Sequence, residues 1–410
     1  MKLQTNLTGI IAILILTVSC SKNNEHYTPQ EVIKSIDLSY ASSIFIGPNL
    51  TTGGLNRTLY KVTVNNEIDT VEYINNFDEP TSPKYYPTDL IRINERFQFL
   101  GHQGIENYII DSQNGYSYLM KNNSPINHNQ VFTDQFIETS KGIIYLGNDS
   151  KIYSFSIPIG SSELIENHIA TDQDGKIMSI TADSKGNILY TANEGNTTDV
   201  YLYQVTNSKS TKIDSVEKIG FTVLWSGLNE NELFYYKPGS DNNESVVYLV
   251  NTQNANIRPY GKNNFVMSCG LNHLFKFNNK VIGIGCNEIY ELVNTEESEE
   301  ILITSLNNYQ IINLRTADKA LDHLLVGGIN SSGRGSIVKI NPNDYSHQNF
   351  NQYTDITPHM ISSNSQGEST VWGTAQQNGK TVLSNINING NVETINQNID
   401  GVIDGLGRLN

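Results

Sequence analysis

The most constraining feature of this 410-residue chain is a repeat of short apolar strands. Eight segments of four or five residues are rich in aliphatic and aromatic side chains, and most end in a small or turn-prone residue. Successive segments end 43 to 54 residues apart, with a mean near 47. The segments are 44–47, 97–101, 143–147, 188–192, 233–237, 281–285, 324–328 and 371–374. A repeat of roughly 40–50 residues made of strands is typical of a β-propeller with one four-stranded blade per repeat.

A second apolar strand follows each of these segments after a polar loop. The second strands are 59–62, 108–110, 152–155, 200–203, 247–250, 289–292, 337–340 and 382–386. Each pair has the pattern of an antiparallel hairpin. We therefore predict an all-β protein, a β-propeller of eight blades with four antiparallel strands each, with seven blades as the alternative. Eight hairpins in phase argue against a β-sandwich.

The N-terminus has the pattern of an export signal. Lys2 precedes an apolar run of twelve residues, 7–18, and Ser19 precedes Cys20. Because a membrane-spanning helix needs about 20 apolar residues, a run of this length predicts a signal peptide over residues 1–19.

The segment 16–20, Leu-Thr-Val-Ser-Cys, resembles the lipobox of bacterial lipoproteins. The resemblance implies that residues 1–19 are removed and that Cys20 is lipidated. Because stable anchoring takes about two acyl chains, a diacylated Cys20 predicts attachment to a membrane. A plain secretory signal with an unmodified cysteine is the alternative.

The residues after Cys20 predict the domain organisation and the localisation of the protein. Residues 20–34 are polar and without periodicity, which is typical of a tether, and residues 35–410 are predicted to form a single propeller domain. An aspartate directly after the lipidated cysteine resembles an inner-membrane retention signal, and this chain has Ser21 at that position. We therefore expect the protein at the outer membrane, on its periplasmic or cell-surface face. The asparagine-rich polar composition, with Ser-Cys-Ser-Lys at residues 19–22, resembles lipoproteins of the Bacteroidota. A TonB-dependent transporter is the envelope partner that this localisation suggests.

The formal net charge of −15 at pH 7 argues against nucleic acid as a partner. Removal of residues 1–19 deletes Lys2 and no acidic residue, so the mature chain is more acidic still.

The other two cysteines, Cys269 and Cys286, form an even pair in an oxidising compartment, which predicts a disulfide. Pairing Phe277 with Lys280 in a hairpin places Cys286 opposite Leu271, a diagonal from Cys269 that is long for a bridge. Two buried thiols are therefore the alternative.

The sequence contains no motif of a nucleophile elbow, a phosphate-binding loop or a zinc-binding helix, and we predict no cofactor and no metal. Asp322 and His323 either pair as a base and its orienting carboxylate or are a packed strand histidine and its neighbour. The segment 172–175, Asp-Gln-Asp-Gly, looks like the start of a calcium loop but lacks the later carboxylates, which favours a plain turn.

The loops between the second and third strands of the blades are unequal in length and several carry a basic residue. Arg57, His102, Lys237 and Arg334 lie in or beside these loops and are candidates for binding an anionic or polyhydroxylated ligand. Solvated loop charges are the alternative.

The segment 182–190, Ala-Asp-Ser-Lys-Gly-Asn-Ile-Leu-Tyr, resembles the turn and strand of NHL and lactonase-type propellers. The resemblance supports the fold and says almost nothing of activity. Our functional hypothesis is a non-catalytic, outer-membrane-anchored lipoprotein that binds a glycan, a chelated metal or an envelope protein. The alternative is a metal-dependent hydrolase or lyase with a site on the propeller axis.

Overall fold

The structure, a computed structural model, describes most of the chain from residue 38 onwards. The described residues are 38, 40–48, 57–63, 65–71, 87–102, 107–120, 136–159, 161, 163–169, 176–193, 200–206, 209–216, 223–226, 230–238, 245–260, 271, 273–277, 280–285, 287–293, 301–320, 322–350, 355–363, 369–387, 389–399, 401, 403 and 405–408. Cys20, Cys269, Cys286 and the segment 172–175 lie outside them, so the lipidation, disulfide and calcium-loop predictions stay predictions.

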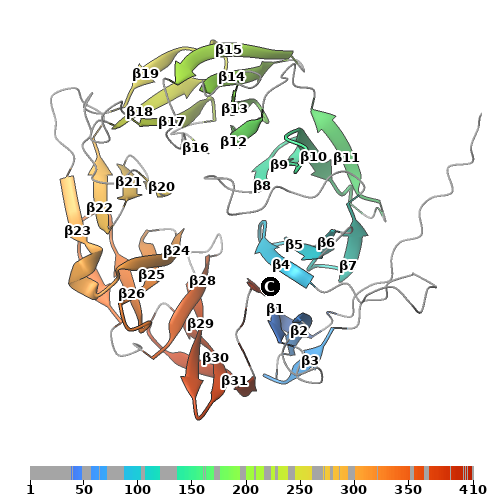
Figure 1. Cartoon of the computed structure of the whole chain (residues 1–410), viewed down its shortest axis with the longest axis vertical. Helices are drawn as coiled ribbons and strands as arrows, with labels where there is room; N and C mark the ends of the chain where they lie inside the picture. Colours follow the sequence, from blue (N-terminus) through green and yellow to red (C-terminus); the bar gives the residue numbers. More distant parts are fainter. Residues whose placement is uncertain are drawn as a thin grey trace, which may run out of the picture.

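Eight four-stranded antiparallel sheets form a ring in the described part of the chain (Figure 1). The strands are β1 (Ala41–Pro48), β2 (Arg57–Thr63), β3 (Ile68–Thr70), β4 (Pro87–Arg92), β5 (Phe97–His102), β6 (Tyr108–Asp111), β7 (Tyr116–Leu119), β8 (Phe136–Thr139), β9 (Gly142–Leu146), β10 (Ile152–Ser156), β11 (Ile165–Ile169), β12 (Ile177–Ala182), β13 (Ile188–Asn193), β14 (Val200–Thr206), β15 (Lys209–Val216), β16 (Val223–Ser226), β17 (Glu232–Pro238), β18 (Ser245–Asn251), β19 (Ile257–Pro259), β20 (His273–Phe277), β21 (Lys280–Gly285), β22 (Glu288–Leu292), β23 (Ile301–Ser305), β24 (Asn313–Lys319), β25 (Leu324–Ile329), β26 (Gly335–Ile340), β27 (His347–Asn349), β28 (Thr357–Ser363), β29 (Ser369–Gln377), β30 (Lys380–Asn387), β31 (Val392–Ile399) and β32 (Gly405–Arg408). A 3₁₀ helix, η3 (Leu306–Tyr309), follows β23. The prediction of an eight-bladed β-propeller is confirmed.

The ring closes by joining the two ends of the chain. Blade 1 consists of β32, β1, β2 and β3, in that order from the axis outwards, and blades 2 to 8 take the strands β4–β31 four at a time. Gly405 to Arg408 pair with Ile46 to Ser43. This pairing explains why the repeat pattern starts at a second strand, because the first strand of blade 1 comes from the C-terminus.

The repeated segments of the sequence are the second and third strands of the blades. Their pairing follows the predicted hairpins, as in Tyr145 opposite Tyr153 in blade 3 and Tyr190 opposite Tyr203 in blade 4. The pairing of Phe277 with Lys280 is also confirmed.

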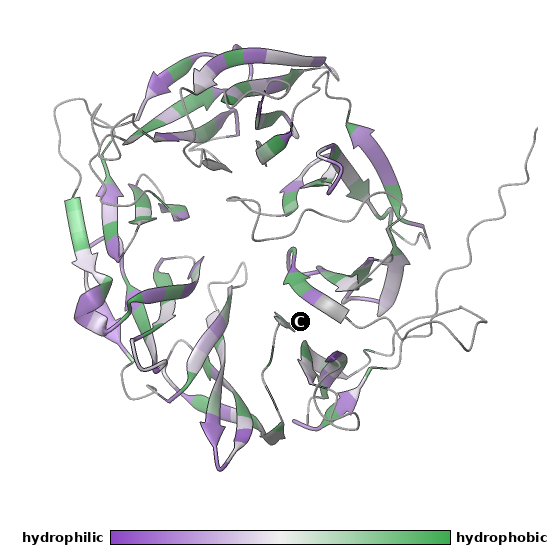
Figure 2. Cartoon of the chain, viewed as in Figure 1, coloured by the Kyte–Doolittle hydropathy of each residue, from purple (hydrophilic) through white to green (hydrophobic). Residues whose placement is uncertain are grey.

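Apolar side chains of the middle strands form the core between neighbouring blades. In blades 3 and 4 an aromatic pair spans the second and third strands, with ring centroids 5.5 Å apart for Tyr145 and Tyr153 and 5.1 Å apart for Tyr190 and Tyr203. The outer strands are more polar, and β11 is mostly hydrophilic in Figure 2. This gradient buries the middle of each sheet and leaves its outer edge in water.

The backbones of blades 7 and 8 are in close contact at Gly335. A Cβ on Gly335 of β26 would lie 1.7 Å from the carbonyl oxygen of Ile356, so only glycine fits at this contact. The residue therefore sets the spacing between these two blades.

The turn that resembles NHL and lactonase-type propellers ties blade 4 to blade 5. The buried carboxylate of Asp183 accepts hydrogen bonds from the backbone N–H groups of Lys185 (3.0 Å) and Asn187 (2.8 Å) and from the Thr252 hydroxyl (2.7 Å). Gly186 has a φ of 78°, which favours glycine. The motif is therefore structural here.

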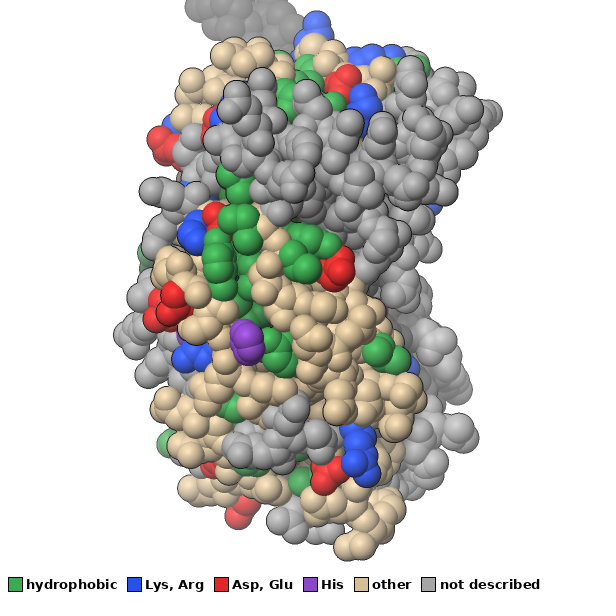
Figure 3. Space-filling view, turned by 90° about the vertical axis from the view of Figure 1, so that its left-hand side faces the viewer, with side chains coloured by type: hydrophobic (Ala, Val, Ile, Leu, Met, Phe, Trp, Pro, Cys, Tyr) green, Lys and Arg blue, Asp and Glu red, His purple; other side chains and the backbone are tan. Residues whose placement is uncertain are grey.

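A strip of exposed apolar side chains lies on the outside of blade 6. Ile301 and Leu302 at the start of β23 are 41% and 52% exposed. Figure 3 shows hydrophobic side chains gathered on this side of the ring. Among the described residues, no helix has both the length and the apolar character needed to cross a bilayer.

Candidate functional site

A cavity of about 1040 Å³ lies on the axis of the ring. Its lining comes from the first strands of five consecutive blades, which are β24, β28, β32, β4 and β8 of blades 7, 8, 1, 2 and 3. Figure 1 shows these strands around the middle of the ring. The cavity also reaches the β4–β5 turn and Gln113 in the β6–β7 turn, so it extends to the face that carries the turns between first and second strands. Its volume is at the upper end of the range for small-molecule sites.

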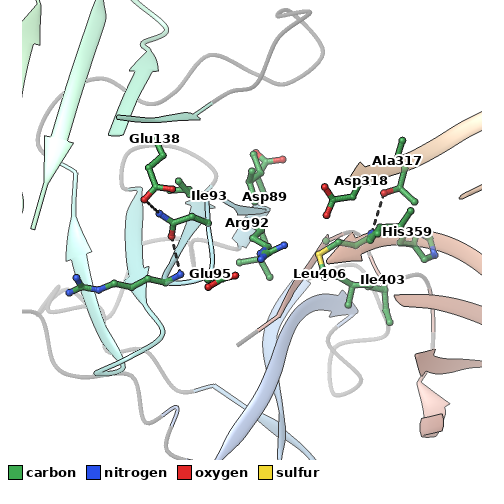
Figure 4. A pocket seen from close by; sticks show the side chains of 18 of the residues that line it. Asp89, Arg92, Ile93, Glu95, Glu138, Ala317, Asp318, His359, Ile403 and Leu406 are labelled. Carbon is green, nitrogen blue, oxygen red and sulfur yellow. Dashed lines mark hydrogen bonds between the residues drawn. The ribbon is translucent and has the colours of Figure 1, made fainter. Parts of the chain in front are cut away.

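Acidic side chains from three blades line this cavity. Asp89 lies on β4, Glu95 in the turn after it, Glu138 on β8 and Asp318 on β24. We call these four residues the axial carboxylates. Figure 4 shows Asp318 directed from blade 7 towards the space beside Asp89 of blade 2. Asp89, Glu95 and Glu138 belong to two consecutive blades, and ring closure brings Asp318 of blade 7 to the same cavity.

The turn after β4 is held rigidly at the lower end of the cavity. Asn94 accepts hydrogen bonds from the backbone N–H groups of Arg96 (2.9 Å) and Phe97 (2.8 Å), and its side-chain amide donates to Glu138 of blade 3 (3.0 Å). These bonds fix Glu138 against blade 2 (Figure 4).

Two guanidinium groups, Arg92 and Arg96, also line the cavity. Arg96 donates from Nε (3.0 Å) and Nη2 (2.5 Å) to the fully buried carboxylate of Asp111. These hydrogen bonds raise the pKa of Arg96, and its guanidinium also lies 4.6 Å from the centre of the Phe97 ring. The charge of Arg96 is therefore matched inside blade 2.

The wall between the acidic strands is apolar. Met360 and Ile361 of β28, with Ile403 and Leu406 before and on β32, line the cavity on blades 8 and 1. His359 stands beside them, and its Nε2 lies 2.8 Å from the Thr374 hydroxyl. Ile361, Ile403 and Leu406 are buried in the cores of the blades, so they offer a ligand little apolar surface.

The described residues contain no group of three or more His, Cys, Asp and Glu side chains placed to hold a metal ion. The axial carboxylates and His359 are thus arranged as separate polar groups around the cavity.

The four cations predicted from the loops are spread around the ring, and those whose side chains the structure describes do not line this cavity. Arg57 is exposed at the start of β2 in blade 1, and Arg334 is exposed in the β25–β26 loop of blade 7. Lys237 of blade 5 lies across the ring from blade 1, where Nζ donates to the Ser215 carbonyl (2.9 Å) and lies 3.6 Å from Asp214. His102 ends β5, and its side chain is outside the described residues. The loop site stays a prediction.

Asp322 and His323 are in contact, with His323 Nδ1 2.6 Å from the Asp322 carboxylate. His323 is only 2% exposed, and burial lowers its pKa, although the Asp322 hydrogen bond opposes this effect. Its Nε2 is buried without a hydrogen-bond partner in the structure, so the ring is a packed side chain.

Sequence reasoning missed the axial carboxylates because it identified only the second and third strands. The first strands carry more polar residues, as in Pro87–Arg92 and Phe136–Thr139, so their apolar pattern is weak. A useful signal was available, since in blades 2 to 8 the residues directly before the second strand form the inner strand of the same blade.

No family model matches the chain, and no curated protein matches it. Solved structures that it resembles include the Dos1 propeller, with a TM-score of 0.53 and 11% identity over 90% of this chain and 96% of that one. The dihydro-heme d1 dehydrogenase NirN in complex with DHE has a TM-score of 0.52 and 8% identity, over 90% of this chain and 75% of that one. A puromycin hydrolase has a TM-score of 0.52 and 8% identity, over 77% of this chain and 54% of that one. The chain is therefore a β-propeller protein, and likenesses at this identity show the fold alone.

Proposed function

We propose that this protein is a lipid-anchored binding protein of the bacterial outer membrane, that its axial cavity takes a small ligand, and that it has no catalytic chemistry of its own. The observation that carries the proposal is the cavity of about 1040 Å³, lined by residues from five blades and by polar side chains from four of them. A site assembled from separate blades is held by the whole ring, so it is preorganised for binding.

The lining favours a ligand with several hydrogen-bond donors. The axial carboxylates are acceptors when ionised, and hydroxyl or amino groups are the donors that they pair with. An oligosaccharide or a similar hydrophilic compound has the size and the donors that such a cavity accommodates. A metal-dependent hydrolase or lyase is the competing activity, and divalent cations are therefore part of the test.

The first experiment follows thermal unfolding of residues 21–410 with neutral, amino and acidic oligosaccharides, ferric siderophores and divalent cations. A ligand at 100 times its Kd stabilises the folded state by about 2.7 kcal/mol, which raises the melting temperature measurably. We expect one class of organic ligand to do so. Stabilisation by a divalent cation alone would contradict the binding-protein proposal and favour the enzyme.

Two double variants then locate the site. Glu138→Gln with Asp318→Asn removes two axial carboxylates, whereas Arg57→Ala with Arg334→Ala removes two of the predicted loop cations. We expect the first pair to reduce the ligand-induced shift and the second to leave it unchanged. The opposite result would place the site in the loops.

The anchor is tested separately. Cys20→Ser in the full chain removes the proposed acyl acceptor, so we expect loss of palmitate labelling and movement of the protein from the membrane to the soluble fraction. Unchanged labelling would contradict lipidation at Cys20.

We also propose that the lipoprotein acts beside an envelope protein, for which a TonB-dependent transporter is the candidate. This proposal is supported only by the predicted localisation at the outer membrane. Cross-linking in intact outer membranes, followed by mass spectrometry, should join the propeller to such a transporter, and reproducible cross-links only to other classes of protein would contradict it.

A further inference from the structure

We infer that the folded propeller rests on the lipid bilayer through one side of its turn face, meaning the face that carries the turns between first and second strands and between third and fourth strands. The contact is made by exposed apolar side chains of blades 8, 1, 2 and 3, which we call the apolar arc. This inference rests on the proposed lipid anchor and adds a membrane contact made by the propeller itself. The apolar arc consists of Val392, Tyr40, Tyr116, Ile159 and Ile165.

Large apolar side chains that are exposed gather at the turn face. Among the described residues eight are exposed, and seven of these lie in a turn of this face or within two residues of one end of a strand beside it. Ile312, which precedes the first strand of blade 7, lies at the opposite face. Single exposed apolar residues are common on protein surfaces, but a shared position indicates an interaction site. The apolar arc accounts for five of the seven, and Ile301 and Leu302 of blade 6 are the other two.

The topology of the blades places the apolar arc at this face. Tyr116, Ile165 and Val392 each start a fourth strand, directly after the turn that follows the third strand. Ile159 lies in such a turn, between β10 and β11. Tyr40 directly precedes β1, which begins at the end of the blade where β2 ends. Ile159 and Tyr40 are 98% and 82% exposed, so each presents nearly its whole side chain to the surroundings.

The chain that leads from Cys20 enters the propeller within the apolar arc. Blades 8, 1, 2 and 3 are neighbours in the ring (Figure 1), and the chain enters blade 1 through Leu38. Leu38 is buried, and its carbonyl accepts a hydrogen bond from the Ala41 N–H (2.9 Å). The segment 21–37 can span at most about 60 Å. A lipid on Cys20 therefore keeps the turn face of blade 1 at a high effective concentration beside the bilayer, and the exposed side chains around this entry point are the ones that meet it.

The charges around the apolar arc favour a zwitterionic surface over an anionic one. Exposed acids at its turns are Glu67, Glu163 and Glu393, whereas Lys141 is an exposed base. An anionic leaflet attracts basic segments and repels acidic ones. The contact must therefore be driven by buried apolar area, which sets the strength of interfacial binding, and it should weaken on anionic lipid.

Hydrogen–deuterium exchange on vesicles tests this contact. The chain from residue 21 onwards contains the whole ring. It carries a hexahistidine tag in place of Cys20 and is held on phosphatidylcholine vesicles that contain a nickel-chelating lipid. We expect peptides covering residues 157–165 and 389–392 to exchange several-fold more slowly on vesicles than in solution, and the β25–β26 loop at the opposite face to be unchanged. Vesicles of phosphatidylglycerol should give less protection.

Two triple variants are matched in the number of exposed apolar side chains that they remove. The first alters the apolar arc, and we expect it to exchange as fast on vesicles as in solution. The second alters exposed residues elsewhere, and we expect it to keep the protection of the wild type. Because all six side chains are exposed, both variants should keep the wild-type melting temperature to within a few degrees. The variants are Tyr40→Ser with Ile159→Ser and Val392→Ser, and Ile301→Ser with Leu302→Ser and Ile312→Ser.

Equal exchange on vesicles and in solution, or protection of β23 in place of the apolar arc, would overturn the inference. Protection that persists in the first triple variant would also overturn it. Slower exchange of the same peptides in native outer membranes but not on vesicles would assign the apolar arc to a protein partner instead of the bilayer. Because the tag needs no acylation, each of these results is independent of the palmitate test of Cys20 and of ligand binding in the axial cavity.

Discussion

The two sides of the propeller axis differ in their acidic side chains although they are built from the same element. The first strands of blades 2, 3 and 7 each carry an acid, Asp89, Glu138 and Asp318. The first strands of blades 4, 5 and 6 (β12, β16 and β20) carry none, and β20 instead has His273 and Lys276. In a closed ring each blade needs its apolar middle strands for packing, but the inner strand borders the axis and is free to vary. The difference shows that the carboxylates of the inner strands are concentrated on one side of the ring.

The largest effect on stability is expected from the Arg96–Asp111 pair of blade 2, beside the axial carboxylates. Arg96→Met removes the partner of Asp111, whose carboxylate is fully buried, and leaves an uncompensated charge. We expect a loss of about 3 kcal/mol in the free energy of unfolding. Urea denaturation measures it, and the double variant with Asp111→Asn should recover part of the loss. Equal stability of Arg96→Met and the wild type would show that this pair does not hold the turn.

The next effect is expected on the other side of the axis. Burial lowers the pKa of His273 to about 4, although part of its surface is exposed. Because the unfolded state takes up this proton near pH 6.5 and the folded state only near pH 4, stability must fall as the pH is lowered through that window. We expect His273→Leu to remove about 2 kcal/mol of the pH dependence. Denaturation midpoints of the wild type and of His273→Leu at pH 7 and pH 4.5 measure this difference. An equal loss of stability in both proteins between the two pH values would refute the lowered pKa of His273.

A smaller effect is expected from a single axial carboxylate. Asp318→Asn should weaken binding of a ligand with several hydrogen-bond donors about 10-fold, and the double variant with Asp89→Asn should weaken it further. Titration of the single and double variants measures this. Strong non-additivity would mean that the two carboxylates act on one group of the ligand.

The smallest effect is expected from the loop cations. Lys237 lies 3.6 Å from Asp214 on a partly exposed surface, and such pairs contribute about 0–1 kcal/mol. Lys237→Ala should therefore lower stability by less than about 1 kcal/mol and leave ligand affinity unchanged. A loss of binding without a loss of stability would return the site to the loops.

The fold could be predicted further than the site. Buried second and third strands such as Ile143 to Leu146 and Ile152 to Phe155 have continuous apolar patterns, because both of their faces pack against other blades. Inner strands such as β8 and β32 are four residues long and border the axis, so their sequences carry little pattern.

The site depends on which residues ring closure brings together. The loop cations were found because glycine-rich loops are visible in a sequence. Asp89 and Asp318 are more than two hundred residues apart in the chain, and their proximity becomes visible only when β32 pairs with β1. The pairing of β32 with β1 also completes blade 1, and the repeats of second and third strands do not predict it.

Hydrogen–deuterium exchange in the presence of the oligosaccharide that raises the melting temperature most would test the axial site most directly. The inner strands have edge amides along the axis, so a ligand in the cavity should slow exchange in peptides that cover β4, β8, β24 and β28. The account predicts this protection, with the β25–β26 loop around Arg334 unchanged. Protection of that loop and of the region of Arg57, with no change in the four inner strands, would contradict it.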